Sequence, residues 1–102
     1  MAEYILQILK SQLFILLSWG FHSPSRIENG LRFYVNGFIH TGAVEVIYNE
    51  GIDLFEVKTL TSDGIVKQMV ESVYIDNLIT VIDNLVEHCD NYEEKVNITY
   101  GL

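Results

Sequence analysis

Cysteine and proline each occur once in this chain of 102 residues, as Cys89 and Pro24. A single cysteine cannot form a disulfide within the chain, so we expect a reducing compartment, the cytoplasm, rather than a disulfide-stabilised secreted scaffold. With one proline, seven glycines and 49% hydrophobic residues, the chain does not have the composition of a disordered segment. The length and composition therefore predict one globular domain over residues 1–102.

Basic residues are also scarce, because six Lys and Arg face fourteen Asp and Glu and leave a net charge of −8. This balance repels phosphate backbones, so we do not expect nucleic acid as a partner. The acids are unevenly distributed: seven lie between Glu71 and Glu94, a stretch without Lys or Arg. Such a charge suits solubility or a basic protein partner.

Long apolar runs are missing near the N-terminus, where the longest, Leu13 to Leu17, is too short to span a bilayer. The first charged residue is Glu3, and the segment has neither a basic start nor an A-x-A-like cleavage site. We therefore expect neither a secretion signal nor a membrane protein.

Motifs for catalysis or metal binding are missing too. His22, His40 and His88 fall in separate predicted elements, and no H-x-x-x-H pair, C-x-x-C pair or carboxylate-rich calcium loop occurs. His88 and Cys89 are neighbours on a predicted helix, so they point about 100° apart and cannot work together as base and nucleophile. We expect no catalytic residue, no metal and no cofactor.

Two helices with different apolar surfaces are predicted. In residues 3–19 the apolar side chains spread over roughly 200° of the helix surface, whereas a single core covers a little over 100°. In residues 75–89 the apolar side chains recur at helical spacing and occupy roughly 120°, with Ser72 a candidate N-cap. The first helix is therefore either sandwiched inside the fold or exposed to a partner.

Between these helices, runs rich in β-branched and aromatic side chains predict four strands joined by short turns, at residues 31–40, 43–48, 53–60 and 65–70. Short turns join antiparallel neighbours, because parallel strands need long crossovers. Residues 20–30 are predicted as a loop and residues 95–100 as a terminal strand. The fold class is thus α+β: a two-layer sandwich in which an antiparallel meander of three to four strands, or five, has the N- and C-terminal helices packed mainly on one face.

Aromatic residues on two elements are candidates for a contact surface. Phe14 projects from the polar side of the first helix, so it is either covered by another part of the fold or an anchor for an oligomer or partner. Tyr34 and Phe38 lie on the strand face opposite the expected core, and this face carries many large apolar groups.

The second helix adds a row of carboxylates that fall within roughly 60° of one another on a helical projection. The row is either a solvated face or a docking strip for a partner rich in Lys and Arg. Its members are Asp76, Asp83, Glu87 and Asp90.

Surplus apolar surface, strong acidity and the lack of catalytic motifs predict a small non-enzymatic protein-interaction module that forms a homodimer or binds a basic protein. Adaptor, inhibitor, immunity protein and chaperone all stay open. The alternative is a small-ligand-binding protein or minor enzyme with a pocket near residues 20–30, lined by Phe21, His22, Tyr34 and Phe38.

Overall fold

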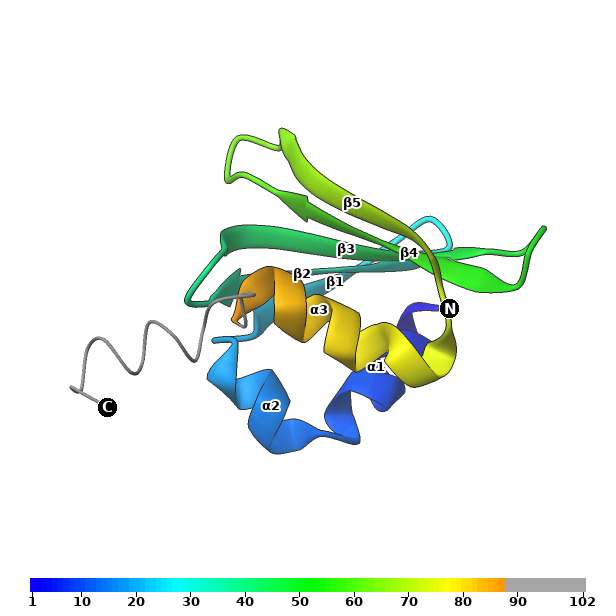
Figure 1. Cartoon of the computed structure of the whole chain (residues 1–102), viewed down its shortest axis with the longest axis horizontal. Coiled ribbons are helices and arrows are strands. Elements are labelled where there is room, and N and C mark those ends of the chain that lie inside the picture. The colour runs from blue at the N-terminus through cyan, green and yellow to red at the C-terminus, as the bar shows by residue number, and fades with distance from the viewer. Residues whose placement is uncertain (88–102) are drawn as a thin grey trace, which may run out of the picture.

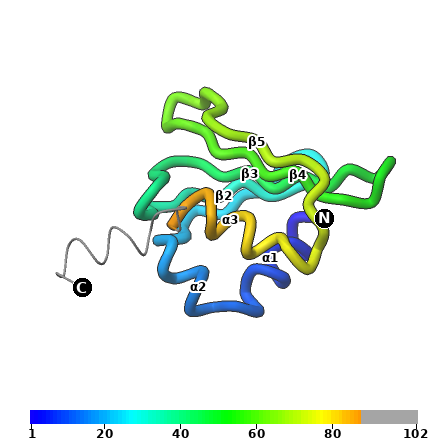
Figure 2. The backbone as a smooth tube through the Cα atoms, viewed as in Figure 1, coloured from blue at the N-terminus to red at the C-terminus, as the bar shows by residue number. Residues whose placement is uncertain are grey.

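The computed structural model describes residues 1–87, which form three α-helices, one 3₁₀ helix (η1) and five strands. In chain order the elements are α1 (Ala2–Lys10), α2 (Leu13–Ser18), β1 (His22–Ile27), β2 (Gly30–Asn36), β3 (Thr41–Asn49), β4 (Leu54–Leu60), β5 (Val66–Val73), η1 (Ile75–Asn77) and α3 (Leu78–Val86). The strands join in the order β1-β2-β3-β4-β5, each antiparallel to its neighbour. Figure 2 follows the chain through this meander.

The α+β class and the antiparallel sheet are confirmed, but the identity of the fifth strand differs from the prediction. The prediction of a loop over residues 20–30 is wrong, because β1 pairs with β2 there. β1 tolerates Pro24 because it is an edge strand, where a missing N–H costs no ladder bond on the open side. The strand predicted at residues 95–100 lies outside the described residues.

The single helix predicted over residues 3–19 is also wrong, since the chain breaks between α1 and α2. The Ser11 hydroxyl donates to the Ile8 carbonyl at 2.6 Å, an alternative to the helical backbone bond. Gln12 then leaves the helical region, with φ −123° and ψ 63°. The break turns α2 so that Leu16 and Trp19, like Ile5 in α1, reach the core.

The core lies between the sheet and the helices, which Figure 1 shows on one side of the sheet. α1 contacts β1 and β2, and α3 contacts β4 and β5. The strands supply alternate residues, as their pairing requires: Phe33 faces Val44, and Val46 faces Val57. The fully buried side chains on the sheet and helices include Ile5, Leu9, Trp19, Phe33, Val44, Val46, Val57, Leu78, Ile82 and Val86.

The helix predicted over residues 75–89 is found as η1 followed by α3, and Leu78, Ile82 and Val86 form its buried stripe. Ser72 is not its N-cap, because Ser72 lies in β5 with a left-handed φ of 57°. Cys89 lies outside the described residues.

The C-terminal end of α3 is fastened to the loop between β2 and β3. The carbonyl of Val86 accepts hydrogen bonds from the N–H groups of Ile39 (2.7 Å) and His40 (3.3 Å), and the Glu87 carboxylate accepts one from the Phe38 N–H (3.0 Å). Gly37 permits this approach, because a Cβ atom there would lie 2.4 Å from the Val86 carbonyl oxygen. Gly37 is therefore a close-packing position, in the loop that follows the end of β2 at Asn36.

Both edges of the sheet are irregular. On β1 the pairing shifts between His22 and Ser25, where Ser23 has φ 55°. On β5 the pairing shifts twice, and Lys67 is the extra residue of one bulge, between the partners of Thr59 and Leu60. Neither edge strand therefore presents a long, regular row of backbone groups.

Replacing Gly37 with Ala should lower the free energy of unfolding by about 1–3 kcal/mol, because the new Cβ forces the β2–β3 loop and the end of α3 apart. Urea unfolding followed by circular dichroism measures the change. Gly51→Ala is the matched control, because the added Cβ there approaches only the Asn49 side chain, at 3.3 Å. Equal stability of the two variants would contradict the proposed role of Gly37.

Thr59 should be a site where a substitution stabilises the fold. Its side chain is buried in β4, and its hydroxyl has no hydrogen-bond partner among the residues that the structure describes. Thr59→Val keeps the branched shape and removes the unsatisfied group, so the free energy of unfolding should rise by about 1 kcal/mol. A lower urea midpoint for Thr59→Val would show that the hydroxyl has a stabilising partner.

Candidate functional site

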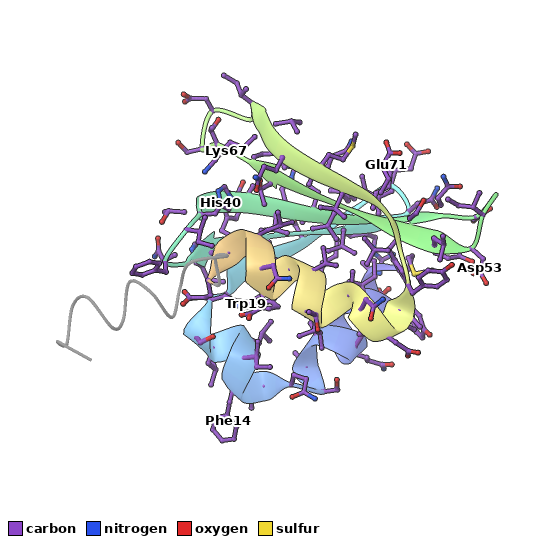
Figure 3. All side chains as sticks on the ribbon, in the orientation of Figure 1. Phe14, Trp19, His40, Asp53, Lys67 and Glu71 are labelled. Atoms are coloured by element: carbon purple, nitrogen blue, oxygen red, sulfur yellow. The ribbon has the colours of Figure 1, made fainter. Side chains whose placement is uncertain are left out.

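The most exposed apolar side chains of the helical layer gather on α2. Leu13, Phe14 and Leu17 are 51%, 88% and 61% exposed, and we call these three residues the α2 surface. Figure 3 shows Phe14 pointing away from the rest of the molecule. No described residue covers this ring, so the possibility that another part of residues 1–87 folds over Phe14 is excluded.

The α2 surface rests on a rigid support formed by Trp19. Its indole is buried and stacks on Phe33, with ring centroids 6.4 Å apart and an interplanar angle of 11°. The indole N–H donates to Asp83 Oδ1 of α3 at 2.9 Å, and the Trp19 carbonyl accepts from the Asn36 N–H of β2 at 2.8 Å. Three contacts, two with β2 and one with α3, therefore hold the end of α2 in place.

The α2 surface also lies in the longest uncharged stretch of the chain. No Asp, Glu, Lys or Arg occurs between Lys10 and Arg26. A contact made through α2 itself would therefore bury no charged side chain.

A second apolar site, which we call the aromatic groove, opens where the start of α1 meets the β3–β4 turn and the connection from β5 to η1. Figure 2 shows these segments at one end of the molecule, and Figure 3 places Asp53 there. The groove has a volume of about 570 Å³. It is lined by Met1, Tyr4, Tyr48, Ile52, Asp53, Leu54, Phe55, Tyr74 and Ile75.

Tyr48 and Asp53 interact within this groove. The Tyr48 hydroxyl donates to Asp53 Oδ1, and this bond raises the pKa of Tyr48 above its ordinary value. The negative charges of Asp53 and Glu50 add to the shift, as does the nearby Tyr4. The groove therefore lies in a negative local field.

The predicted acidic strip is only partly available to a partner. Asp76 is exposed in η1, but Asp83 accepts the Trp19 hydrogen bond and Glu87 accepts one from Phe38. Asp90 lies outside the described residues. At least two of the four carboxylates thus stabilise the fold, and the strip as a docking site stays a prediction.

The residues proposed to line a pocket near residues 20–30 have different surroundings in the structure. His22 stacks on Tyr34, with ring centroids 5.9 Å apart. Phe21 instead packs on Phe33 in the core, at 4.8 Å, and Phe38 is exposed in the β2–β3 loop. The structure brings the His22 and Tyr34 rings together and directs the Phe21 ring into the core instead.

A buried histidine lies directly before β3, and nothing in the sequence distinguished it as a buried residue. His40 is 1% exposed; its Nε2 lies 3.0 Å from the Ala43 carbonyl and its Nδ1 lies 3.1 Å from Lys67 Nζ. Because a carbonyl only accepts and an ammonium only donates, His40 is neutral and carries its proton on Nε2. Burial lowers the pKa of His40 below its ordinary value of 6.5, the Ala43 hydrogen bond opposes the shift, and the Lys67 charge adds to it.

Within residues 1–87, no group of three or more His, Cys, Asp or Glu side chains is placed to hold a metal ion. In the same part of the chain, no helix has the length and apolar character needed to cross a bilayer. Comparison with protein-family models, curated proteins and solved structures finds no significant match.

The aromatic groove was not predicted, because its residues come from three distant parts of the sequence. The available signal was aromatic content: Tyr4, Tyr48 and Tyr74 are three of the six tyrosines in the chain.

Stability should fall as the pH drops below about 6.5, because unfolded His40 then binds a proton that folded His40 rejects. The loss should be complete below the lowered pKa of the folded state. Urea unfolding between about pH 7.5 and pH 5 measures it. His40→Gln keeps a donor for Ala43, removes the imidazole and leaves every other titratable group in place, so its stability should fall less than that of the wild type. Parallel pH profiles for the two proteins would contradict the assignment.

Proposed function

We propose that this protein is a small, acidic, non-enzymatic interaction module that self-associates through the α2 surface. The observation that carries the proposal is the 88% exposure of Phe14 on a helix whose other side is fixed in the core. Aromatic side chains are enriched in the buried centres of protein interfaces. A phenyl ring held outward by a rigid support suits that role.

Charge favours a second copy of the chain on this surface. Each copy carries a net charge of −8, so two copies repel at most points of contact. α2 contains no charged residue, so a pair related by a two-fold axis can meet there without burying like charges.

The energy of such a contact is modest. Burying one large apolar side chain is worth about 1.5–3 kcal/mol, and two copies bring three each. Association itself costs about 4–15 kcal/mol. The balance predicts a dimer that forms and dissociates with concentration.

The proposal includes two finer features. The helices form one layer of a two-layer sandwich, which leaves the outer side of α2 open to another molecule. The protein acts in the cytoplasm, a reducing compartment that suits a chain whose one cysteine is Cys89.

Phe14→Ser should shift the protein from dimer to monomer at concentrations where the wild type is a dimer, with an unchanged urea midpoint. Sedimentation velocity over a range of concentrations measures the change. Ile65→Ser is the matched control, because Ile65 is 65% exposed on the β4–β5 turn, away from α2. Added salt should strengthen the dimer, since it screens the repulsion between acidic copies.

Two results would overturn this proposal. The first is a wild type that stays monomeric at high concentration. The second is loss of folding in Phe14→Ser, which would make the ring part of the core.

A further inference from the structure

The aromatic groove combines an apolar floor with a negative rim. Phe55 is buried at its base and contacts Tyr48, with ring centroids 5.4 Å apart, while Tyr4 and Tyr74 are exposed at its sides. The volume of about 570 Å³ lies in the range of pockets that hold a ligand or several side chains. Aromatic faces and a nearby carboxylate are the surroundings that an organic cation prefers.

The charged groups around the groove are mostly negative. Asp53 lines it, Glu50 lies close enough to affect Tyr48 electrostatically, and Asp76 follows the lining residue Ile75. No Lys, Arg or His is among the lining residues that the structure describes. Among the lining residues, the positive charge comes from the α-amino group of Met1.

We propose that the aromatic groove docks a segment of another protein that carries an Arg or Lys side chain beside apolar residues. The apolar residues would lie against Ile52 and Phe55. The cation would lie near Tyr74 and the Asp53 carboxylate, which has a second oxygen besides the one that accepts from Tyr48. This partner site is separate from the α2 surface and does not depend on self-association.

A second copy of the chain is a poor occupant, because its basic side chains are few and largely engaged. Residues 1–87 contain five Lys and Arg. Arg26 pairs with Glu3, Arg32 pairs with Glu45, and Lys67 contacts His40. A different protein with a basic, apolar segment complements the groove better.

Titration with short peptides tests the proposal. The probes are acetyl-Gly-Leu-Arg-Leu-Gly-amide and the same peptide with Gln in place of Arg, and the readout is the backbone amide shifts of the ¹⁵N-labelled protein. The Arg peptide should shift amides of residues 50–55 and 74–76 and bind about three- to tenfold more tightly than the Gln peptide. Added salt should weaken the binding of the Arg peptide, because it screens the attraction between the Arg side chain and the groove.

Three variants in the groove assign the contacts, and a fourth, on α2, is the control. Asp53→Asn keeps the acceptor for Tyr48 and suits the left-handed backbone at this position, where φ is 56°, but it removes the charge. Asp53→Asn should weaken the binding of the Arg peptide about three- to tenfold and leave the binding of the Gln peptide unchanged. Tyr74→Ala should weaken the binding of both peptides, and Tyr74→Phe, which keeps the aromatic ring, should bind both as the wild type does. Phe14→Ser should leave the binding of both peptides unchanged.

Several results would overturn the proposal. Equal binding of the Arg and Gln peptides would remove the role of charge, and shifts on α2 would place the site elsewhere. Binding of arginine amide as tightly as the peptide would make the groove a site for small cations rather than for a partner segment. The absence of any shift would exclude the groove as a docking site, while leaving the test of self-association by Phe14→Ser untouched.

Discussion

The burial of Trp19 is the constraint on which the arrangement of the helices depends. Its indole packs on Phe33 of the sheet and donates a hydrogen bond to Asp83 of α3. Its backbone carbonyl accepts a hydrogen bond from the N–H of Asn36, at the end of β2. Successive residues on a helix turn by about 100°, so burying Leu16 forces Phe14 to nearly the opposite side. The exposure of Phe14 is thus a direct consequence of the contacts that hold α2 to the core.

The parts of the fold that the sequence predicted are those set by local periodicity. The stripe of Leu78, Ile82 and Val86 and the alternation along β2, β3 and β4 depend on neighbours in the chain, so they could be seen without the structure. The break at Ser11 and Gln12 could not, because the residues on both sides are good helix formers and only the core decides where the helix turns. β1 was missed because Pro24 argues against a strand, and only its edge position makes it acceptable.

The candidate sites were harder to predict, for a related reason. Sequence shows that a residue carries a charge but not whether another group already uses it, so Asp83 and Glu87 looked available although each accepts an internal hydrogen bond. Phe14 was identified because its position contradicts the pattern around it. The aromatic groove gave no such contradiction, since it exists only where Tyr4, the β3–β4 turn and Tyr74 come together.

The bulges on β1 and β5 limit the kinds of assembly that the protein can form. Exposed, regular edge strands allow sheets to extend from one molecule to the next without limit, which leads to fibres. Here Pro24 and Ser23 interrupt one edge, and Lys67 and Ser72 interrupt the other. If copies associate as proposed above, these irregular edges favour contact through side-chain surfaces, where two copies can close on each other, over extension of the sheet from one molecule to the next.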